Sequence, residues 1–215
     1  MDKNLIQKSI KDLRENAKKR KFSQSFDLIV TLKDLNLKNV DEQVDFFTTI
    51  PHIQGKQKVA ALVGPELEEK AKKICDITIN VDDFDKYKDK KLAKKLAAEH
   101  TFFIAQAEIM PKVAATFGRV LGPRNKMPNP KLGSVLPAKG QVETIYERLQ
   151  KTVRVMAKKS PVIQVKIGKE DMTDEQIIEN IQHAYNQIVH HLPKEKSNVK
   201  EIMLKLTMSK PVKIE

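Results

Sequence analysis

The sequence predicts an α/β fold with two domains, one formed from both ends of the chain and the other inserted between its halves. Two observations support this prediction. Residues 59–151 alternate short, wholly apolar segments with helical patterns, which is typical of a parallel sheet covered by helices on both faces. Residues 1–58 and 152–215 combine helical patterns with strands of alternating polar and apolar residues, which indicates an α+β domain. Two crossings would join the domains and favour a hinge.

The N-terminal part begins with apolar residues at helical spacing over residues 5–17, followed by the basic cluster 18–21. We expect this cluster first to end the helix, where cations suit the helix dipole, and second to contact nucleic acid. Residues 26–32 alternate, with Ile29 as the exception, and predict a strand. A second apolar run covers residues 44–50, and a polar linker follows it.

The middle part carries three apolar runs that predict strands, each followed by a helical stretch. The runs cover residues 59–63, 77–81 and 101–105, and the helical stretches cover residues 65–73, 90–98 and 108–121. Pro111 lies in the first turn of the third helical stretch, where a missing backbone N–H is no loss.

The C-terminal part predicts three more strands and one long amphipathic helix. The strands cover residues 152–156, 161–167 and 199–206. The helix begins at a capping box formed by Thr173 and Gln176, in which each side chain satisfies a backbone N–H of the first turn. Its buried stripe consists of Ile177, Ile181, Ala184, Tyr185, Ile188 and Leu192.

Composition and charge point to an anionic partner. The 215 residues include 40 Lys and Arg against 28 Asp and Glu, and the net charge of +12 is spread along the chain. Such an excess bears on binding rather than on fold, and a lysine-rich but otherwise ordinary soluble protein stays an alternative. The single cysteine, Cys75, favours a reducing compartment, and no apolar run reaches the ~20 residues that span a bilayer. We expect a cytoplasmic protein without a signal segment or a membrane partner.

The most informative segment is the stretch of residues 118–140, which holds four of the chain's seven glycines and four of its ten prolines. Proline fixes φ and glycine supplies positive φ, so we expect a preformed loop. A preformed loop loses little entropy when its cations bind a polyanion, which favours nucleic acid as the partner. These cations are Arg119, Arg124, Lys126 and Lys131.

Catalytic and metal-binding patterns are absent from the sequence or have simpler explanations. The chain contains no Walker A, GxGxxG, HExxH or GxSxG pattern, so we expect no cofactor, no metal and no enzymatic activity. His183 and His190 lie seven residues apart, but no further ligand spacing completes a metal site. Glu143 and Glu147 lie one helical turn apart beside basic residues, which favours a solvated helix face over acid–base chemistry.

Residues 121–133, Leu-Gly-Pro-Arg-Asn-Lys-Met-Pro-Asn-Pro-Lys-Leu-Gly, resemble the signature of the family of large-subunit ribosomal protein one, in its archaeal form. The resemblance runs essentially from end to end. Lys21-Phe22 leads into the first strand and Thr207-Met208 follows the last strand, as in the family. The resemblance implies a discontinuous α+β domain and an inserted Rossmann-like, three-layer α/β domain.

The same resemblance implies a structural RNA-binding protein of the large ribosomal subunit. Family members bind the rRNA of the mobile side stalk by the exit site, where deacylated tRNA leaves. Several also repress translation of their own mRNA by binding a structure in it that mimics this rRNA. The implied partners are therefore side-stalk rRNA, exit-site tRNA and the protein's own mRNA, with the chain a monomer within the ribosome.

In the family, the discontinuous domain makes the principal RNA contact. The matching positions of this sequence are Lys21, Phe22, Ser25, Asp27, Gln164, Lys166, Thr207, Met208 and Ser209. Lysines can neutralise phosphates, hydroxyls can bind a ribose 2′-OH, and apolar side chains can pack on sugars or bases. A carboxylate such as Asp27 weakens phosphate binding, which indicates a specific acceptor role. The simpler explanation of Phe22, Ser25 and Asp27 is an ordinary strand entrance. For Thr207 and Met208 it is an ordinary strand end.

Ser209 departs from the family, which usually has glycine at this position. If that glycine needs a positive φ or a close approach to RNA, serine would cost about 1–2 kcal/mol. The basic loop belongs to the other domain, where we expect either secondary RNA or tRNA contacts or a role in the domain interface.

Two alternative functions belong to other classes. A nucleotide-dependent enzyme on the inserted domain would lack a glycine cradle, and Glu66, Glu68 and Glu69 at the start of its first helix would repel phosphate. A general nucleic-acid chaperone would rely on charge alone, with sequence-independent affinity and steep salt dependence.

Overall fold

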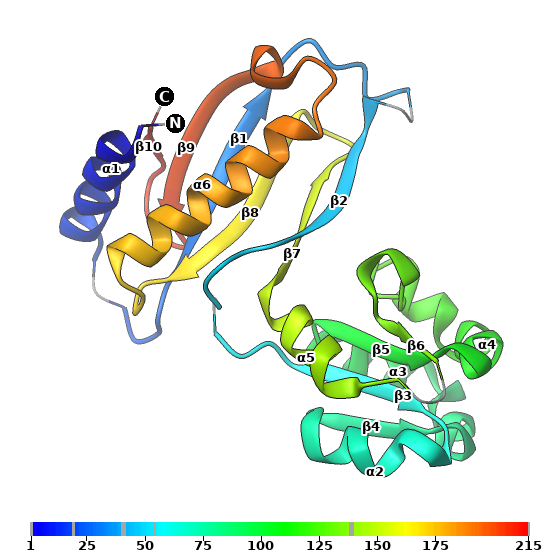
Figure 1. Ribbon diagram of the computed structural model, residues 1–215. Coiled ribbons are helices and arrows are strands. Elements are labelled where there is room, and N and C mark those ends of the chain that lie inside the picture. Colours follow the sequence, from blue (N-terminus) through cyan, green and yellow to red (C-terminus); the bar gives the residue numbers. More distant parts are fainter. Residues whose placement is uncertain (1, 19, 40–41, 54, 138–139, 215) are drawn as a thin grey trace. The chain divides into compact units, whose positions relative to one another are not determined.

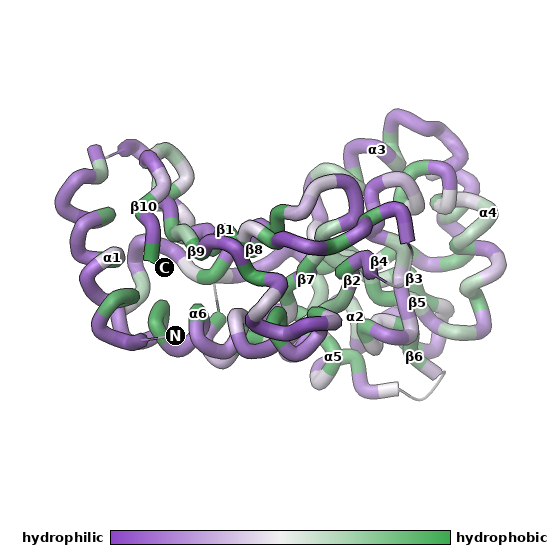
Figure 2. Tube along the Cα trace, turned by 90° about the horizontal axis from the view of Figure 1, so that it is seen from above, coloured by the Kyte–Doolittle hydropathy of each residue, from purple (hydrophilic) through white to green (hydrophobic). Residues whose placement is uncertain are grey.

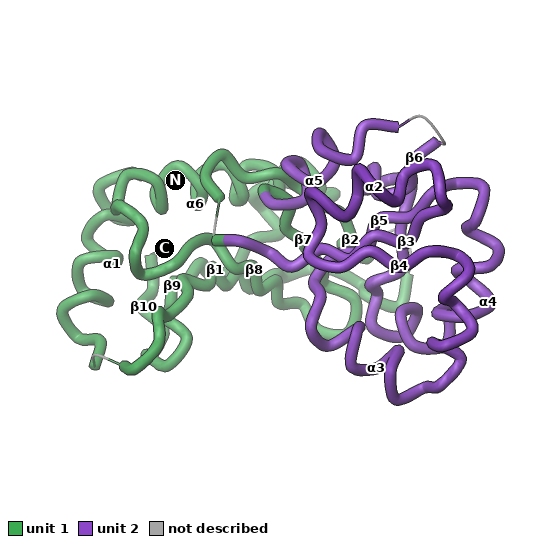
Figure 3. The backbone as a smooth tube through the Cα atoms, turned by 90° about the horizontal axis from the view of Figure 1, so that it is seen from below, with its two compact units in different colours: residues 1–55, 151–215 green, residues 56–150 purple. Residues whose placement is uncertain are grey.

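The computed structural model describes residues 2–214 except residues 19, 40–41, 54 and 138–139. The chain forms two compact units, which we call unit 1 (residues 1–55 with 151–215) and unit 2 (residues 56–150) (Figure 1, Figure 3). Unit 1 is an α+β unit around an antiparallel sheet, and unit 2 is built on a parallel sheet, so the predicted fold class is confirmed. In the described part of the chain, no helix is long and apolar enough to cross a membrane.

Unit 1 has an antiparallel sheet in the order β10-β9-β1-β8 and a separate antiparallel pair, β2 with β7. Its elements are α1 (Lys3–Asn16), β1 (Ser25–Leu32), β2 (Val44–Thr49), β7 (Thr152–Ala157), β8 (Val162–Lys169), α6 (Asp174–His190), a 3-10 helix (Glu195–Asn198), β9 (Val199–Leu206) and β10 (Val212–Lys213). The capping box at Thr173 is confirmed, since its hydroxyl accepts from the N–H of Gln176.

The unit 1 sheet has one face covered by helices and one open face. Burial alternates along β1, and Phe26, Leu28 and Val30 lie in the core that α1 and α6 complete. Helix α6 packs on β8 and α1 packs on β9 (Figure 1). Asp27 and Ile29 therefore lie on the open face. Ile29, the exception to the alternation, places an apolar side chain on this face.

Helix α1 is shorter than its apolar pattern predicted. It ends at Asn16, and Ala17 already has an extended backbone. Residues 18–21 therefore follow the helix and do not form its last turn; Lys19 is outside the described residues. The basic side chain in the last turn is Arg14.

Unit 2 has a parallel sheet in the order β4-β3-β5-β6. Its elements are β3 (Val59–Val63), α2 (Pro65–Ile74), β4 (Ile77–Asn80), a 3-10 helix (Val81–Lys88), α3 (Lys90–Glu99), β5 (Phe102–Gln106), a 3-10 helix (Ala107–Ile109), α4 (Met110–Leu121), a 3-10 helix (Pro130–Leu132), β6 (Val135–Leu136) and α5 (Val142–Lys151). Every residue of β3 is buried, because α3 lies on one side of the strands and α2 and α5 lie on the other (Figure 2).

Two details of unit 2 differ from the sequence prediction. The strand predicted over residues 77–81 ends at Asn80, where the Asn80 side chain caps a 3-10 helix that the sequence analysis missed. The sequence placed residues 118–121 both in the helical stretch 108–121 and in the loop 118–140, and in the structure they complete α4. Arg119 is therefore a helical residue, and residues 138–139 of the stretch are outside the described residues. Pro111 lies in the first turn of α4, as predicted.

Candidate nucleic-acid interface

The predicted strand residues meet on the open face of unit 1. Strand β1 runs antiparallel to both β8 and β9, and the register places Asp27 opposite Lys166 on one side and opposite Lys205 on the other. A carboxylate thus lies between two cations on the sheet face opposite to the one that α1 and α6 cover. Lys205 is a functional candidate that the sequence analysis missed, although the alternation of the last strand placed it on the polar face.

A second row lies one pleat further along the same face. Ile29 is opposite Gln164 of β8 and opposite Met203 of β9. Gln164 is exposed, whereas the other two side chains are half-buried. This row offers apolar surface beside an amide that can donate and accept, which suits contact with a base or a sugar.

A β-bulge in β8 sets the register of the first row. Phe26 pairs with Gly168, but the next residue, Asp27, pairs with Lys166. Ile167 is therefore the extra residue of the bulge. An extra residue changes the direction of the neighbouring side chains and locally interrupts the hydrogen bonds between the strands. Without the bulge, Lys166 would not lie opposite the carboxylate.

The buried side chain of Asn180 forms a hydrogen bond to the bulge from the sheet face that the helices cover. Asn180 of α6 is fully buried, and its Nδ2 donates to the Ile167 carbonyl at 2.9 Å. The same amide accepts from the N–H of His52 at 2.9 Å and donates to the carbonyl of His52 at 3.1 Å. Asn180 thus connects β8 with the segment that follows β2, a role that no local pattern of residues indicated.

The charges of Asp27 and Lys166 oppose folding rather than support it. Burial raises the pKa of the Asp27 carboxyl, while Lys205 and Lys166 act in the opposite direction. Burial also lowers the pKa of Lys166, with Lys169 adding to that shift. A carboxyl pKa that is higher in the folded chain means that ionisation costs folding free energy as the pH rises through the acid range. Charges kept at such a cost favour a binding role for this row.

The ends of β1 and β9 are joined beside the open face. The Thr207 hydroxyl accepts from the N–H of Ser25 at 3.0 Å, and the N–H of Thr207 donates to the Ser25 carbonyl at 3.1 Å. The buried amide of Gln24 accepts from the N–H of Met208 at 3.2 Å. The Thr207 hydroxyl therefore continues the hydrogen bonding between β1 and β9 at the end of the sheet. Its oxygen keeps a second lone pair, which can accept a hydrogen bond from a partner.

Two large apolar side chains stand exposed at this end of the sheet. Phe22 is 52 % exposed and Met208 is 59 % exposed. The backbone of Met208 binds Gln24, two residues after Phe22, so both segments leave the sheet at the same end. Lys21, also exposed, precedes them. Exposed apolar groups beside cations form a surface suited to stacking on nucleic acid.

Ser209 occupies a turn that does not need glycine. Among the described residues, the non-glycine positions with positive φ are Asp34, Asn125 and Glu195. Ser209 is described and is not one of them, so a strain penalty for positive φ is wrong for this chain. Its hydroxyl accepts from the N–H of Leu206 at 2.8 Å and closes the turn after β9.

We therefore expect Ser209→Gly to destabilise the chain by about 1 kcal/mol, because the Leu206 N–H loses its partner and glycine adds freedom to the unfolded chain. Urea unfolding of the full chain measures this effect. A stabilised variant would show that serine is strained at this position after all.

The cations of the basic loop are divided between internal bonds and solvent. The Lys126 ammonium donates to the carbonyls of Ala97 at 2.8 Å and His100 at 2.7 Å, at the end of α3. Arg124 Nη1 donates to the Lys94 carbonyl at 3.2 Å. Burial lowers the pKa of Lys126. The loop thus stabilises α3 by satisfying carbonyls that a helix end leaves unpaired.

The remaining two predicted loop cations are exposed. Arg119 lies in the last turn of α4, where its charge suits the helix dipole. Lys131 lies in the 3-10 helix that the Asn129 side chain caps, and Gly133 ends that helix with φ of 74°. The turn is closed further by the Ser134 hydroxyl, which accepts from the Asn129 N–H at 2.8 Å. These bonds give the loop a defined shape.

We expect Lys126→Met to destabilise the chain by about 1–2 kcal/mol, since two carbonyls at the end of α3 lose their donor while the aliphatic stem is kept. Lys131→Met is the matched control, and its exposed position predicts a change within about 0.5 kcal/mol. Urea unfolding compares them, and equal midpoints would contradict the capping role.

The turn between β3 and α2 does not offer a phosphate cradle. The Gly64 N–H, which precedes α2, donates to the Gln106 side chain at 2.9 Å in a buried position. A side chain at Gly64 would meet Gln106 Oε1 at 3.0 Å. Glu66 and Glu68 occupy the first turn of α2, as predicted. This geometry disfavours nucleotide binding at the start of α2.

The other candidate chemistry is equally unsupported. Within the described residues, no group of three or more His, Cys, Asp or Glu side chains could hold a metal ion. His183 has a buried Nδ1 without a hydrogen-bond partner among these residues, and Glu143 and Glu147 are exposed on α5. Burial raises the pKa of the Cys75 thiol to about 11, which makes it a poor nucleophile.

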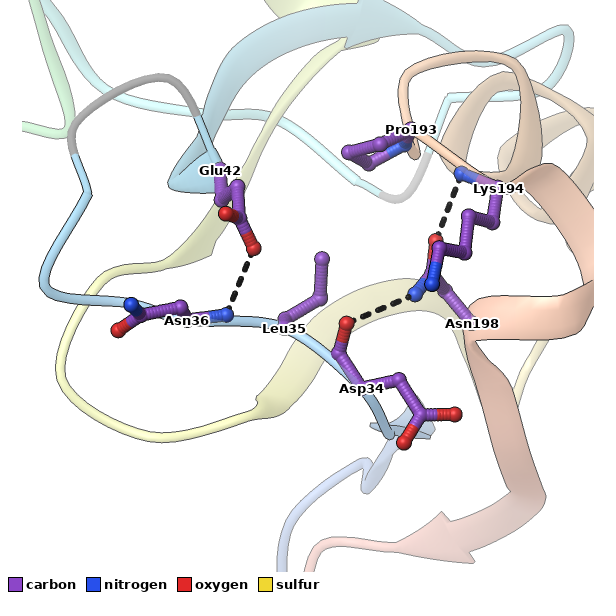
Figure 4. Close-up of a pocket in the computed structure, with 7 residues that line it drawn as sticks. All are labelled: Asp34, Leu35, Asn36, Glu42, Pro193, Lys194 and Asn198. Atoms are coloured by element: carbon purple, nitrogen blue, oxygen red, sulfur yellow. Dashed lines mark hydrogen bonds between the residues drawn. The ribbon is translucent and has the colours of Figure 1, made fainter.

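A pocket of about 670 Å³ lies where β1 ends and β9 begins, at the other end of these strands from Ser25 and Thr207. Figure 4 shows that its polar groups bind one another: Asn198 donates to the Asp34 carbonyl, and its side-chain oxygen accepts from the Lys194 N–H at 2.7 Å. Asn36 N–H donates to Glu42. Because these polar groups bind one another, the described lining of the pocket does not indicate a ligand.

Known proteins with similar sequences belong to one family. Residues 13–210 match the family described as ribosomal protein L1p/L10e. The chain is 40% identical over 217 residues to the large ribosomal subunit protein uL1 of Methanothermococcus thermolithotrophicus, with 100% of both chains covered. It is 42% identical over 210 residues to that of Nanoarchaeum equitans, covering 95% of this chain and 97% of the other. The corresponding protein of Methanocaldococcus jannaschii is 36% identical over 217 residues, with coverage of 100% and 97%.

These relatives are ribosomal proteins and not enzymes, which agrees with the lack of a phosphate cradle at Gly64. Their matches cover 95% to 100% of this chain and so include both units. The chain belongs to the ribosomal protein L1p/L10e family.

Proposed function

We propose that this ribosomal protein of the large subunit binds the rRNA of the mobile side stalk with the open face of unit 1. From that position it assists the release of deacylated tRNA from the exit site. It also represses translation of its own mRNA by binding a structure there that resembles the rRNA. The relatives, which are large-subunit proteins, support the ribosomal assignment.

One observation carries the RNA-binding part of the proposal. Asp27 lies between Lys166 and Lys205 on the sheet face opposite α1 and α6, and exposed Phe22 and Met208 stand at the end of that face. The lysines would neutralise phosphates, whereas the carboxylate would accept from a 2′-OH or a base amino group and reject a misplaced phosphate. Such a mixed surface is suited to one RNA shape rather than to any polyanion.

A salt-titrated binding assay tests the proposal by comparing a side-stalk rRNA fragment with a scrambled RNA of equal length. We expect the rRNA fragment to bind more tightly by a factor above roughly 10³ at physiological salt. Equal affinities that fall together as salt rises would leave a charge-driven chaperone and would remove the proposed site.

A further inference from the structure

Helix α3 of unit 2 presents a lysine face that the proposed function does not use. Its four lysines are exposed, and on a helix with 100° per residue they lie within an arc of about 140°. They are Lys90, Lys91, Lys94 and Lys95. The opposite side of the helix is buried through Ala93, Leu96 and Ala97. We call the four exposed residues the α3 lysine face.

The ammonium groups of this face have no hydrogen-bond or ion-pair partner among the described residues. The preceding 3-10 helix differs, because Lys86 pairs with Asp83 at 2.6 Å and Lys88 pairs with Asp85 at 2.6 Å. The nearby carboxylate of Asp89 is already engaged, since it accepts from the N–H of Lys91 at 2.9 Å as the helix cap. Within the described part of unit 2, no ion pair therefore neutralises the α3 lysine face.

The position of these lysines is unfavourable for the helix itself. Lys90 and Lys91 lie in the first turn, which contains no acidic residue, and the helix dipole disfavours cations there. Each of them also has a lysine four residues later, and like charges at this spacing repel. An anion bound along the face would remove both penalties.

The basic loop makes α3 a fixed platform for such an anion. Lys126 and Arg124 donate to backbone carbonyls at α3, including that of Lys94, so both side chains are bound to this helix. The loop cations thus hold the helix, while the lysines on the helix remain available. Lysines four residues apart are separated by about 6 Å along the helix, and their ammonium groups contact phosphates without reading bases.

We propose that the α3 lysine face binds the phosphate backbone of RNA independently of its sequence. It would act as a second anchor in addition to the shape-specific site of unit 1. The inference rests on the proposed RNA-binding function but assigns a separate surface and a separate kind of contact. The face should therefore contribute to affinity and salt dependence and not to discrimination between RNAs.

The test compares two variants of the full chain, each with four exposed lysines replaced by glutamine. One carries Lys90→Gln, Lys91→Gln, Lys94→Gln and Lys95→Gln. The control carries Lys58→Gln, Lys70→Gln, Lys73→Gln and Lys112→Gln, which removes the same charge from scattered sites of unit 2. Binding of the side-stalk rRNA fragment and of the scrambled RNA is measured across salt concentrations.

For the α3 variant we expect weaker binding of both RNAs by the same factor, on the order of 10-fold or more, and a salt slope shallower by roughly 2 to 4. The preference for the rRNA fragment should stay unchanged. Equal slopes for the α3 variant and the control would overturn the proposal. So would loss of binding to phosphatidylserine vesicles with unchanged RNA slopes, which would assign the face to an anionic membrane. If the unsubstituted chain lacks a preference for the rRNA fragment, the unit 1 site fails, while the slope comparison still decides the α3 face.

Discussion

Phe22→Ala is expected to weaken binding of the side-stalk rRNA fragment by roughly 10- to 100-fold and to leave the stability of the chain unchanged. The side chain is 52 % exposed and precedes the strand whose open face carries Asp27. Stacking of an aromatic ring on a base contributes about 1–3 kcal/mol, which corresponds to this range of affinity. Because little of the ring is packed in the core, its removal costs little folding free energy.

Leu5→Ala is the matched control for this variant. Leu5 is an exposed apolar residue of unit 1, 45 % exposed, but it lies on α1, which covers the other face of the sheet. We expect its RNA affinity to equal that of the unsubstituted chain. If Phe22→Ala and Leu5→Ala bind the rRNA fragment alike, Phe22 is only an exposed residue at a strand entrance and makes no contact with RNA.

The largest effect on stability is expected for Asn180→Ala, at about 3 kcal/mol. This buried amide makes bonds to the Ile167 carbonyl and to both backbone groups of His52, and alanine leaves all three without a partner. Each buried backbone group without a partner costs about 1–3 kcal/mol, and the shared site makes the costs less than additive. Urea unfolding, followed by far-UV circular dichroism, measures the difference.

Asn16→Ala serves as the control, since Asn16 is an exposed amide that donates to the Asp12 carbonyl at 2.8 Å. We expect a change within about 0.5 kcal/mol for it. The bulge at Ile167 also aligns Lys166 with Asp27, so folded Asn180→Ala should lose part of its preference for the rRNA fragment. Matching midpoints for the two asparagine variants would show that water replaces the lost amide.

The sequence predicted features that depend on local chemistry. The alternation of residues 26–32 placed Phe26 in the core and Asp27 on the opposite face, and burial along β1 follows that pattern. The last strand has the predicted bounds, 199–206, and Thr173 and Gln176 form the predicted capping box. Each of these features follows from side-chain periodicity or from a hydrogen bond within one helical turn.

The missed features depend on contacts between distant segments. Lys126 binds carbonyls 29 and 26 residues earlier in the chain, and Asn180 binds His52, 128 residues earlier. No local pattern contains such a pairing, which is why the sequence predicted RNA or tRNA contacts or a domain-interface role for the loop and did not predict its bonds to α3. Lys205 was missed as a site residue because the family resemblance did not include it, although its alternation with Leu204 and Leu206 indicated its face.

The short strands β6 and β10 were missed because two residues are too few to show alternation. The pairing of each is set by its neighbour, since β6 follows the register of β5 and β10 follows that of β9. Whether the turn at Ser209 needs glycine was left open by the sequence, because its φ and its hydrogen bond to Leu206 are properties of the folded turn.

The most direct test of the central claim is the methionine methyl NMR spectrum of the full chain, titrated with the side-stalk rRNA fragment. Met203 lies on the open face beside Ile29, and Met208 stands exposed at its end, whereas Met156 is exposed on β7 outside this sheet. We predict that the rRNA fragment shifts the signals of Met203 and Met208 and leaves that of Met156 in place. Tight and specific RNA binding with unchanged Met203 and Met208 signals would contradict the assignment of the open face as the RNA site.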